Sequence, residues 1–254
     1  MTTTDKHAYN TVSWFDLMSP EPAKTRDFYA GLFGWTYQIG GPEMGNYSMA
    51  QVAGKNAAGI GQPPPSSTMP SVWTAYWNVE SADATAKSIV DHGGTIMMPV
   101  MDVMDAGRMA IAIDPTGAAF GLWQPGRHTG AQVVSQHGAM GWQECHTRDG
   151  AKAQDFYARV FKLEPVKVEG MEYWLLQRGP THLGGVDHDM KMPAHVPPHW
   201  LVYFDVDNAD ACVAKIAATG GKVLMPAFDT PHGRMAVAAD PFGAAFAVIQ
   251  PPKQ

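Results

Sequence analysis

The chain combines short runs of apolar residues, many with the two-residue period of a β-strand, with longer segments of helical periodicity. In its first half this pattern predicts a strand, a helix and three strands, and then the same series again. The first helix begins near Pro20 and Pro22 and ends at Gly34, and the second has Ser81 as its N-cap. The expected strands are 12–17, 37–39, 47–52, 57–61, 72–79, 95–101, 108–113 and 118–123, and the expected helices are 22–33 and 82–91.

The second half of the chain repeats the first. Residues 107–125 and 233–251 are identical at 13 of 19 positions. The sequence Asp-Phe-Tyr at 27–29 recurs at 155–157, and Trp14 recurs as Trp142. We therefore predict two homologous domains, residues 1–127 and 138–254, joined by the polar, glycine-bearing linker 128–137.

Composition and charge exclude several classes of protein. The formal net charge is −6 and no basic run occurs, which argues against nucleic-acid binding. No stretch approaches the roughly 20 apolar residues of a membrane helix, and the first residues lack a signal-peptide pattern. The two cysteines, Cys145 and Cys212, indicate a reducing compartment. We expect a cytoplasmic monomer or homodimer. The 16 methionines lie largely on strands, where flexible thioethers fill gaps in a packed sheet.

Four βαβββ units in two halves, each half with Phe-Tyr in its first helix and Asp-Pro-x-Gly before its last strand, resemble the vicinal oxygen chelate superfamily. This superfamily comprises glyoxalases, bleomycin-resistance proteins and extradiol dioxygenases. The sequence DPTGAAFGLWQP is most similar to two-domain bacterial glyoxalase-like proteins that are often labelled hydroxylases. The resemblance implies an α+β fold of tandem glyoxalase-like domains, in which the four units form two cup-shaped sheets. It also implies a divalent metal held by His and Glu in many members.

The usual metal positions of that superfamily carry no suitable donors in this chain. Alignment on the Phe-Tyr and Asp-Pro-x-Gly motifs places them at Trp14, Thr74 and Gly121 in the first half and at Trp142, Leu201 and Ala247 in the second. Apart from the weak threonine hydroxyl, none is a metal ligand. We expect no metal at these positions.

A displaced site is possible in the second half only. Side chains alternate along a strand, so Glu144 and His146 face the same way as Trp142, and His199 shares the face of Leu201. Glu144, His146 and His199 could therefore hold iron or zinc. In the alternative, His146 lies in solvent and Glu144 pairs with a nearby base. The first half has Asp16, Met18 and Val72 at these positions.

Aromatic residues recur in register and predict a small-molecule pocket in each cup. They are Trp14, Tyr47 and Tyr76 in the first half and Trp142, Tyr173 and Tyr203 in the second. In the alternative, these rings only fill the core. Arg234 repeats Arg108 and could anchor an anionic ligand or act structurally. Cys145 faces away from the cup, and the stretch around Asp187 and Asp189 reads as a solvated loop.

Two functions compete. The first is an enzyme of isomerase, lyase or dioxygenase type that converts a small, oxygen-rich or aromatic molecule in the second cup, with either no cofactor or a single divalent metal. Its expected catalytic residues are Glu144, as general base or metal ligand, and His146, as acid/base partner. Its expected substrate-binding residues are Trp142, Tyr173, His199, Tyr203 and Arg234. The alternative is metal-free binding and sequestration of a small molecule, as in bleomycin-resistance proteins. Neither involves a nucleic acid or a membrane.

Overall fold

The computed structural model describes residues 2–4, 6–64 and 70–252. Residues 65–69, which lie between the expected strands 57–61 and 72–79, are outside these ranges. The elements of the first half are β2 (Thr11–Met18), α1 (Pro22–Phe33), β3 (Thr36–Ile39), η1 (Pro42–Met44), β4 (Ser48–Val52), β5 (Lys55–Gly61), β6 (Val72–Asn78), α2 (Ala82–Asp91), β7 (Thr95–Val103), β8 (Gly107–Ile113) and β9 (Ala119–Pro125). Those of the second are β11 (Met140–Thr147), α3 (Gly150–Phe161), β12 (Glu164–Lys167), β13 (Tyr173–Arg178), β14 (Thr181–His188), β15 (His199–Asp205), α4 (Ala209–Ala218), β16 (Lys222–Thr230), β17 (Gly233–Ala239) and β18 (Ala245–Gln250).

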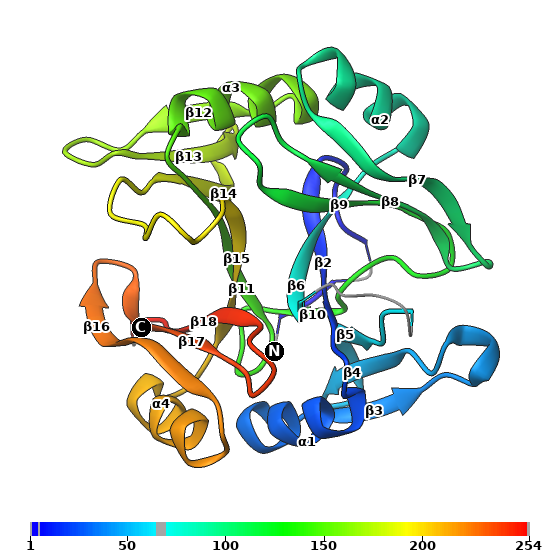
Figure 1. Ribbon diagram of the computed structural model, residues 1–254, viewed down its shortest axis with the longest axis vertical. Helices are drawn as coiled ribbons and strands as arrows, with labels where there is room; N and C mark the ends of the chain where they lie inside the picture. Colours follow the sequence, from blue (N-terminus) through cyan, green and yellow to red (C-terminus); the bar gives the residue numbers. More distant parts are fainter. Residues whose placement is uncertain (1, 5, 65–69, 253–254) are drawn as a thin grey trace.

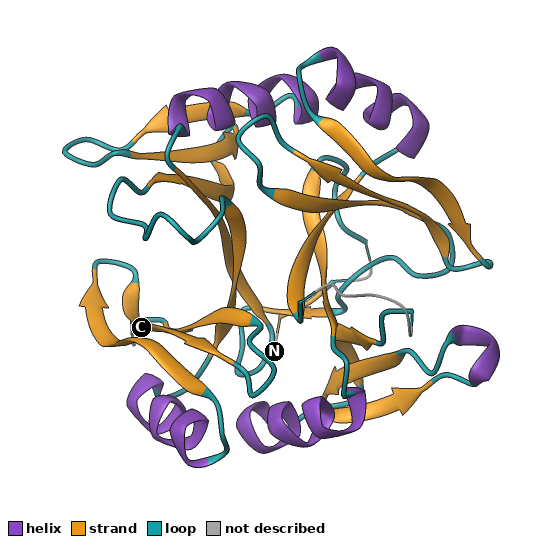
Figure 2. Cartoon of the chain, in the orientation of Figure 1, coloured by secondary structure: helices purple, strands orange, loops and turns teal. Residues whose placement is uncertain are grey.

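Each half forms one curved sheet from two βαβββ units. The first sheet has the strand order β3-β4-β5-β2-β6-β9-β8-β7, and the second has the matching order β12-β13-β14-β11-β15-β18-β17-β16. Figure 1 shows the two sheets side by side, with α2 and α3 together at one end of the molecule and α1 and α4 at the other. Figure 2 shows the strands lying between these two pairs of helices. The predicted α+β fold of four βαβββ units is confirmed.

One feature of the chain crosses the expected division into halves. The short strand β1 (Thr2–Thr3) pairs with β10 (Val133–Val134), and β10 pairs with β11 of the second sheet. The N-terminal residues therefore contact a strand within the expected linker, because β10 offers them a free edge for antiparallel pairing. The segment 128–137 is thus partly built into the second sheet.

The convex faces of the two sheets pack against each other. Trp77 of β6 stacks on Phe161 of α3 with ring centroids 4.2 Å apart, and Phe15 of β2 meets Phe204 of β15 edge to face. Residues of both halves belong to one buried cluster. Packing of this kind is contiguous and dense, so the two halves form a single hydrophobic core.

The repeated motifs join the two halves reciprocally. The carboxylate of Asp114, in the Asp-Pro-x-Gly turn of the first half, accepts a 2.8 Å hydrogen bond from the Tyr157 hydroxyl of the second half. In the mirror arrangement, the Tyr29 hydroxyl of the first half donates to Asp240 of the second at 3.5 Å. Each tyrosine also accepts a hydrogen bond from a tryptophan of its own half. The motifs therefore fix the contact between the domains.

Removing one of these hydroxyls should lower the free energy of unfolding. Tyr157→Phe leaves the buried Asp114 Oδ2 with only the weak donor Cys145, whose Sγ lies 3.7 Å away. We expect a loss of about 1–3 kcal/mol, the usual cost of an unsatisfied buried acceptor. Urea denaturation measures it, with Tyr9→Phe as a control at a 39% exposed tyrosine. An unchanged midpoint for Tyr157→Phe would show that the contact does not stabilise the fold.

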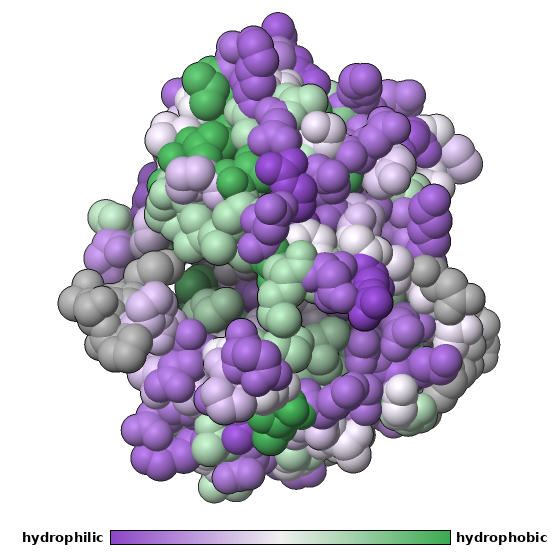
Figure 3. All heavy atoms as spheres, turned by 90° about the vertical axis from the view of Figure 1, so that its right-hand side faces the viewer, coloured by the Kyte–Doolittle hydropathy of each residue, from purple (hydrophilic) through white to green (hydrophobic). Residues whose placement is uncertain are grey.

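The positions of several methionines differ from the sequence prediction that these side chains fill gaps in the packed sheet. Several are exposed rather than packed in gaps of the sheet: Met44, Met97, Met98, Met101, Met104, Met171, Met190 and Met225. Met97, Met98 and Met101 lie on β7 and Met225 lies on β16, which are edge strands with a neighbour on one side only. Figure 3, which looks onto the β7 side of the molecule, shows apolar side chains at the surface around a hollow.

Among the helices of the described residues, none is both long and apolar enough to cross a membrane.

Candidate active site in the second cup

Strand β11 places three consecutive cup-facing side chains, Trp142, Glu144 and His146, on one face of the second sheet. In the register, Glu144 lies opposite Gly185 of β14 and Leu201 of β15, and His146 lies between Asp187 and His199. The intervening Cys145 points to the convex side, is buried, and has a pKa raised by burial and by Asp114. The alternation predicted from the sequence is therefore present.

Three aromatic side chains hold the Glu144 carboxylate. Its Oε1 accepts hydrogen bonds from the Trp142 indole (3.0 Å) and the Tyr173 hydroxyl (2.7 Å), and its Oε2 accepts one from the Tyr203 hydroxyl (2.7 Å). The Tyr173 ring reaches this position only because residue 185 is glycine, since a Cβ there would lie 1.8 Å from the tyrosine oxygen. The carboxylate is thus fixed in one orientation.

These contacts keep Glu144 ionised. Burial alone would raise the pKa of its carboxyl, but His146 and the two tyrosine hydroxyls outweigh burial and hold the pKa below its usual value. The same negative charge, together with burial, raises the pKa of Tyr173 and Tyr203. Both hydroxyls therefore stay protonated and remain donors.

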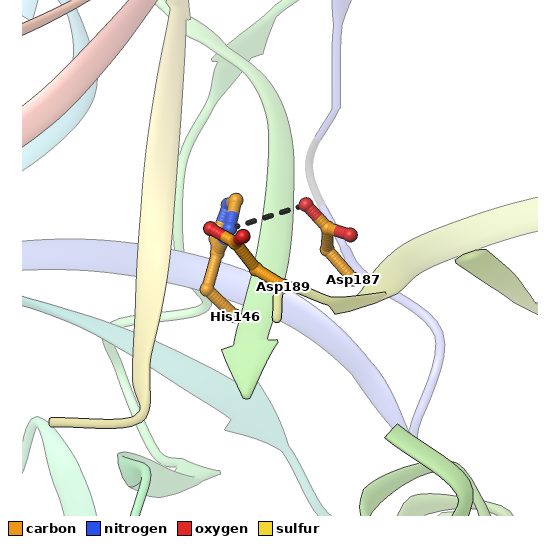
Figure 4. Close-up of side chains that lie close together, drawn as sticks. All are labelled: His146, Asp187 and Asp189. Carbon is orange, nitrogen blue, oxygen red and sulfur yellow. Dashed lines mark ion pairs between the residues drawn. The ribbon is translucent and has the colours of Figure 1, made fainter. Parts of the chain in front are cut away.

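His146 lies between carboxylates on both sides of its ring. Its Nε2 is 3.5 Å from Glu144 Oε2, and its Nδ1 is 3.4 Å from Asp187 Oδ2. Figure 4 shows Asp187 and Asp189 directed at the imidazole. Burial would lower the pKa of His146, but Glu144, Asp187 and Asp189 outweigh burial and raise it. The side chains of Glu144 and His146 are only 14% and 15% exposed, so these charges interact with little screening by solvent.

His199 stacks on His146 with ring centroids 5.4 Å apart and an interplanar angle of 12°. Burial lowers the pKa of His199, so this ring is the neutral partner. Its Nδ1 donates a 2.9 Å hydrogen bond to the Pro197 carbonyl, which leaves Nε2 as an acceptor. The structure thus brings His199 beside His146, as the strand pattern predicts.

Arg234 is not brought to the cup, which corrects its assignment as a ligand-binding residue. Its guanidinium pairs with Asp210 of α4 at 2.8 Å and with Asp229 at 3.0 Å. Its neighbours Met235 and Val237 pack against the cup-facing Leu201 and Tyr203 instead. Since side chains alternate along a strand, Arg234 faces the helix side of the sheet. Arg108 is held in the same way by Asp83 and Asp102.

The expected metal trio of Glu144, His146 and His199 is also not the one that the structure assembles. Among the described residues, His146, Asp187 and Asp189 form the group whose potential ligand atoms lie within 4.8 Å of one another. The sequence pattern predicts a solvated loop around both aspartates. Asp187 instead lies within β14, one residue before its end, directly opposite His146 on a parallel strand. This pairing depends on the register of two strands far apart in the sequence, so no local pattern of residues indicates it.

The superfamily's usual metal positions do not fit a metal in either cup. Trp142 uses its indole N–H to hold Glu144, and Leu201 and Ala247 pack together in an apolar cluster. In the first cup the Trp14 indole donates to Tyr47. A Cβ at Gly121 would lie 2.2 Å from the Tyr76 ring, so aromatic side chains fill this position.

The first cup repeats the aromatic frame around a different carboxyl. Trp14 donates to the Tyr47 hydroxyl at 3.0 Å, and this hydroxyl donates to Asp16 Oδ2 at 3.3 Å. Burial raises the pKa of Asp16 to about 7, although Tyr47 and Tyr76 partly oppose the shift. Met18 stands in place of His146, so no imidazole balances this carboxyl. The frame is common to both cups, and the charge differs.

Comparison with known proteins places this geometry in context. The model of the Glyoxalase/Bleomycin resistance protein/Dioxygenase superfamily matches residues 11–122 and 141–248. The chain is 41% identical over 257 residues to "Putative glyoxylase CFP32" of Mycobacterium tuberculosis, covering 98% of each. It is 37% identical to "Anthracycline biosynthesis protein DnrV" of Streptomyces peucetius, covering 94% of this chain and 92% of the relative. The fold is similar to the Mn(II)-bound glyoxalase from Novosphingobium aromaticivorans, with a TM-score of 0.66 and 12% identity over 95% of this chain and 82% of the other.

Proposed function

The chain belongs to the Glyoxalase/Bleomycin resistance protein/Dioxygenase superfamily, and we propose that it is an enzyme that converts a small organic molecule in its second cup. The observation that carries this proposal is the ionised Glu144, fixed by Trp142, Tyr173 and Tyr203 and set against His146. Burying a charged pair costs desolvation free energy, so a buried pair held by several donors suggests a functional role. Titratable groups with perturbed pKa values in a cup mark candidate active sites.

The geometry divides the roles within this pair. Glu144 accepts three hydrogen bonds and has a lowered pKa, so it is a weak base and acts by holding and polarising His146. His146 directs Nε2 at this carboxylate and Nδ1 at Asp187. The imidazole is therefore the reactive group of the site. In this setting an imidazole supports either acid/base or metal-assisted chemistry on a substrate oxygen.

An oxygen-bearing aromatic molecule fits these walls best. Trp142 and Tyr173 provide partly exposed aromatic surface, and Met225 and Phe228 on β16 add exposed apolar side chains. A relative of 37% identity is named for anthracycline biosynthesis. We therefore propose polycyclic aromatic ketones and quinones of the anthracycline type as the class to test first.

The alternative function is binding without conversion. It is supported by the aromatic frame around Asp16, which recurs in the first cup without an imidazole. The two functions separate in one measurement. An enzyme changes the mass or absorption spectrum of the ligand over time, whereas a sequestering protein returns it unaltered.

Substituting His146 tests the proposal directly. We expect His146→Gln to lower turnover of an anthracycline, measured by liquid chromatography and mass spectrometry, by at least 100-fold while the protein stays folded. The control is Met18→Gln, which introduces the same residue at the matching position of the first cup. Equal activity of His146→Gln and the unsubstituted protein would exclude the imidazole as the reactive group.

A further inference from the structure

We infer that His146, Asp187 and Asp189 form a binding site for one divalent metal ion in the second cup, away from the positions that the superfamily uses. This inference rests on the proposed function, because it concerns the imidazole at the centre of that site. It assigns Nδ1 of His146 as the metal-binding nitrogen.

The spacing of the three side chains fits a shared ion. One potential ligand atom from each lies within 4.8 Å of the others, and His146 Nδ1 and Asp187 Oδ2 are 3.4 Å apart. Metal–ligand bonds of about 2.1 Å place neighbouring donor atoms about 3 to 3.5 Å apart. Figure 4 shows the three side chains converging from two strand ends. Small side-chain rotations would complete the coordination geometry.

The charge balance of the cluster also favours a cation. Three carboxylates, those of Glu144, Asp187 and Asp189, surround one imidazole. None of the ion pairs found among the described residues joins a lysine or arginine to these carboxylates. A divalent ion bound between these side chains would supply the positive charge that no lysine or arginine brings to them.

The hydrogen bonding of His146 is a second observation, independent of the spacing and charge of the three side chains. Its Nε2 is buried and has no hydrogen-bond partner among the described residues, although Glu144 Oε2 lies 3.5 Å away. A metal ion on Nδ1 would fix the tautomer, with the proton on Nε2 facing that carboxylate. This is the carboxylate–histidine–metal arrangement, in which the outer carboxylate orients the ring and raises its basicity.

Glu144 is the orienting group of this arrangement rather than a ligand. Both of its oxygens already accept hydrogen bonds from Trp142, Tyr173 and Tyr203. One imidazole nitrogen and two carboxylate oxygens suit a first-row ion such as Mn²⁺ or Zn²⁺. The first cup has Met18 and Gly61 where the second has His146 and Asp187, so it offers no equivalent site.

Direct metal titration of the full chain tests the inference without any organic ligand. We expect one Mn²⁺ per chain, measured by the electron paramagnetic resonance signal of free Mn²⁺, with Zn²⁺ competing for the same site. Asp187→Asn and Asp189→Asn should each weaken Mn²⁺ binding at least tenfold. Glu144→Gln should weaken it about tenfold by loosening the ring.

The matched control is Asp207→Asn, which removes a carboxylate 3.7 Å from a different histidine, His137. It should leave Mn²⁺ affinity unchanged. The inference is overturned if the unsubstituted protein binds neither ion at 1 mM, if both Asp187→Asn and Asp189→Asn bind Mn²⁺ as tightly as it does, or if Asp207→Asn loses as much affinity. Such a failure would leave the proposed function standing, because ligand turnover and its dependence on His146 are measured separately.

Discussion

Glu144→Gln should lower the affinity or turnover of an anthracycline ligand by well over tenfold. The substitution keeps the shape of the side chain but removes the charge that polarises His146. It also replaces one carboxylate oxygen by an amide NH₂ group. Each of the two oxygens now accepts a hydrogen bond from a hydroxyl or indole donor, and the NH₂ group cannot accept one. At least one donor then loses its acceptor, and the imidazole loses its nearest counter-charge. Quenching of tryptophan fluorescence on titration gives the dissociation constant, and steady-state rates separate kcat from KM.

Asp16→Asn is the matched control, since Asp16 has the same position in the first cup and also accepts hydrogen bonds from two tyrosines, Tyr47 and Tyr76. It should change ligand affinity and turnover much less. The reverse result, with Asp16→Asn damaging and Glu144→Gln silent, would place the function in the first cup. Equal effects of both substitutions would mean that the two cups share the ligand.

The two cups have similar aromatic surroundings but hold their buried carboxyl groups in different ionisation states. Each has a carboxyl on its first long strand, flanked by a tryptophan and two tyrosines from neighbouring strands. In the second cup, His146 makes the ionised carboxylate favourable. In the first cup, Met18 provides no charge, so burial favours the protonated acid. A single position two residues along the strand therefore decides the charge of each cup.

Most of the architecture follows from local patterns in the sequence. The helix limits were predictable because Pro22 and Ser81 favour helix starts and Gly34 adopts φ +70° at the end of α1. The cup-facing set of Trp142, Glu144 and His146 was predictable because alternation along one strand needs no knowledge of its neighbours. The repeat then predicted the second half from the first.

What the sequence could not provide depends on contacts between strands or between halves. The face on which Arg234 lies depends on the pairing of β17 with β18, which puts Met235 and Val237 in the cup. Asp187 was missed because its position opposite His146 requires the parallel register of β11 and β14. The bond between Asp114 and Tyr157 depends on how two separate sheets dock, which no local pattern encodes.

The buried carboxyl of the first cup should make stability depend on pH. Asp16 has a pKa of about 7 in the folded chain, against about 3.9 when unfolded. Between these values the folded chain keeps the proton that the unfolded chain has lost, so unfolding releases a proton and stability falls as pH rises from about 4 to 7. Above about pH 7 both states are ionised and the contribution of Asp16 is constant.

Asp16→Asn should remove this dependence, because the amide is neutral at every pH. We expect the substituted protein to gain stability relative to the unsubstituted protein as pH rises from 5 to 8. Over this range the gain is at most about 2.7 kcal/mol, the equivalent of about two pKa units. Urea denaturation at pH 5 and pH 8 measures the difference between the two proteins, so other titrating groups cancel. Asp207→Asn, at an exposed aspartate, should show the same difference at both pH values. A pH-independent difference for Asp16→Asn would mean that the pKa of Asp16 is not raised in the folded chain and that its carboxyl is ionised at both pH values.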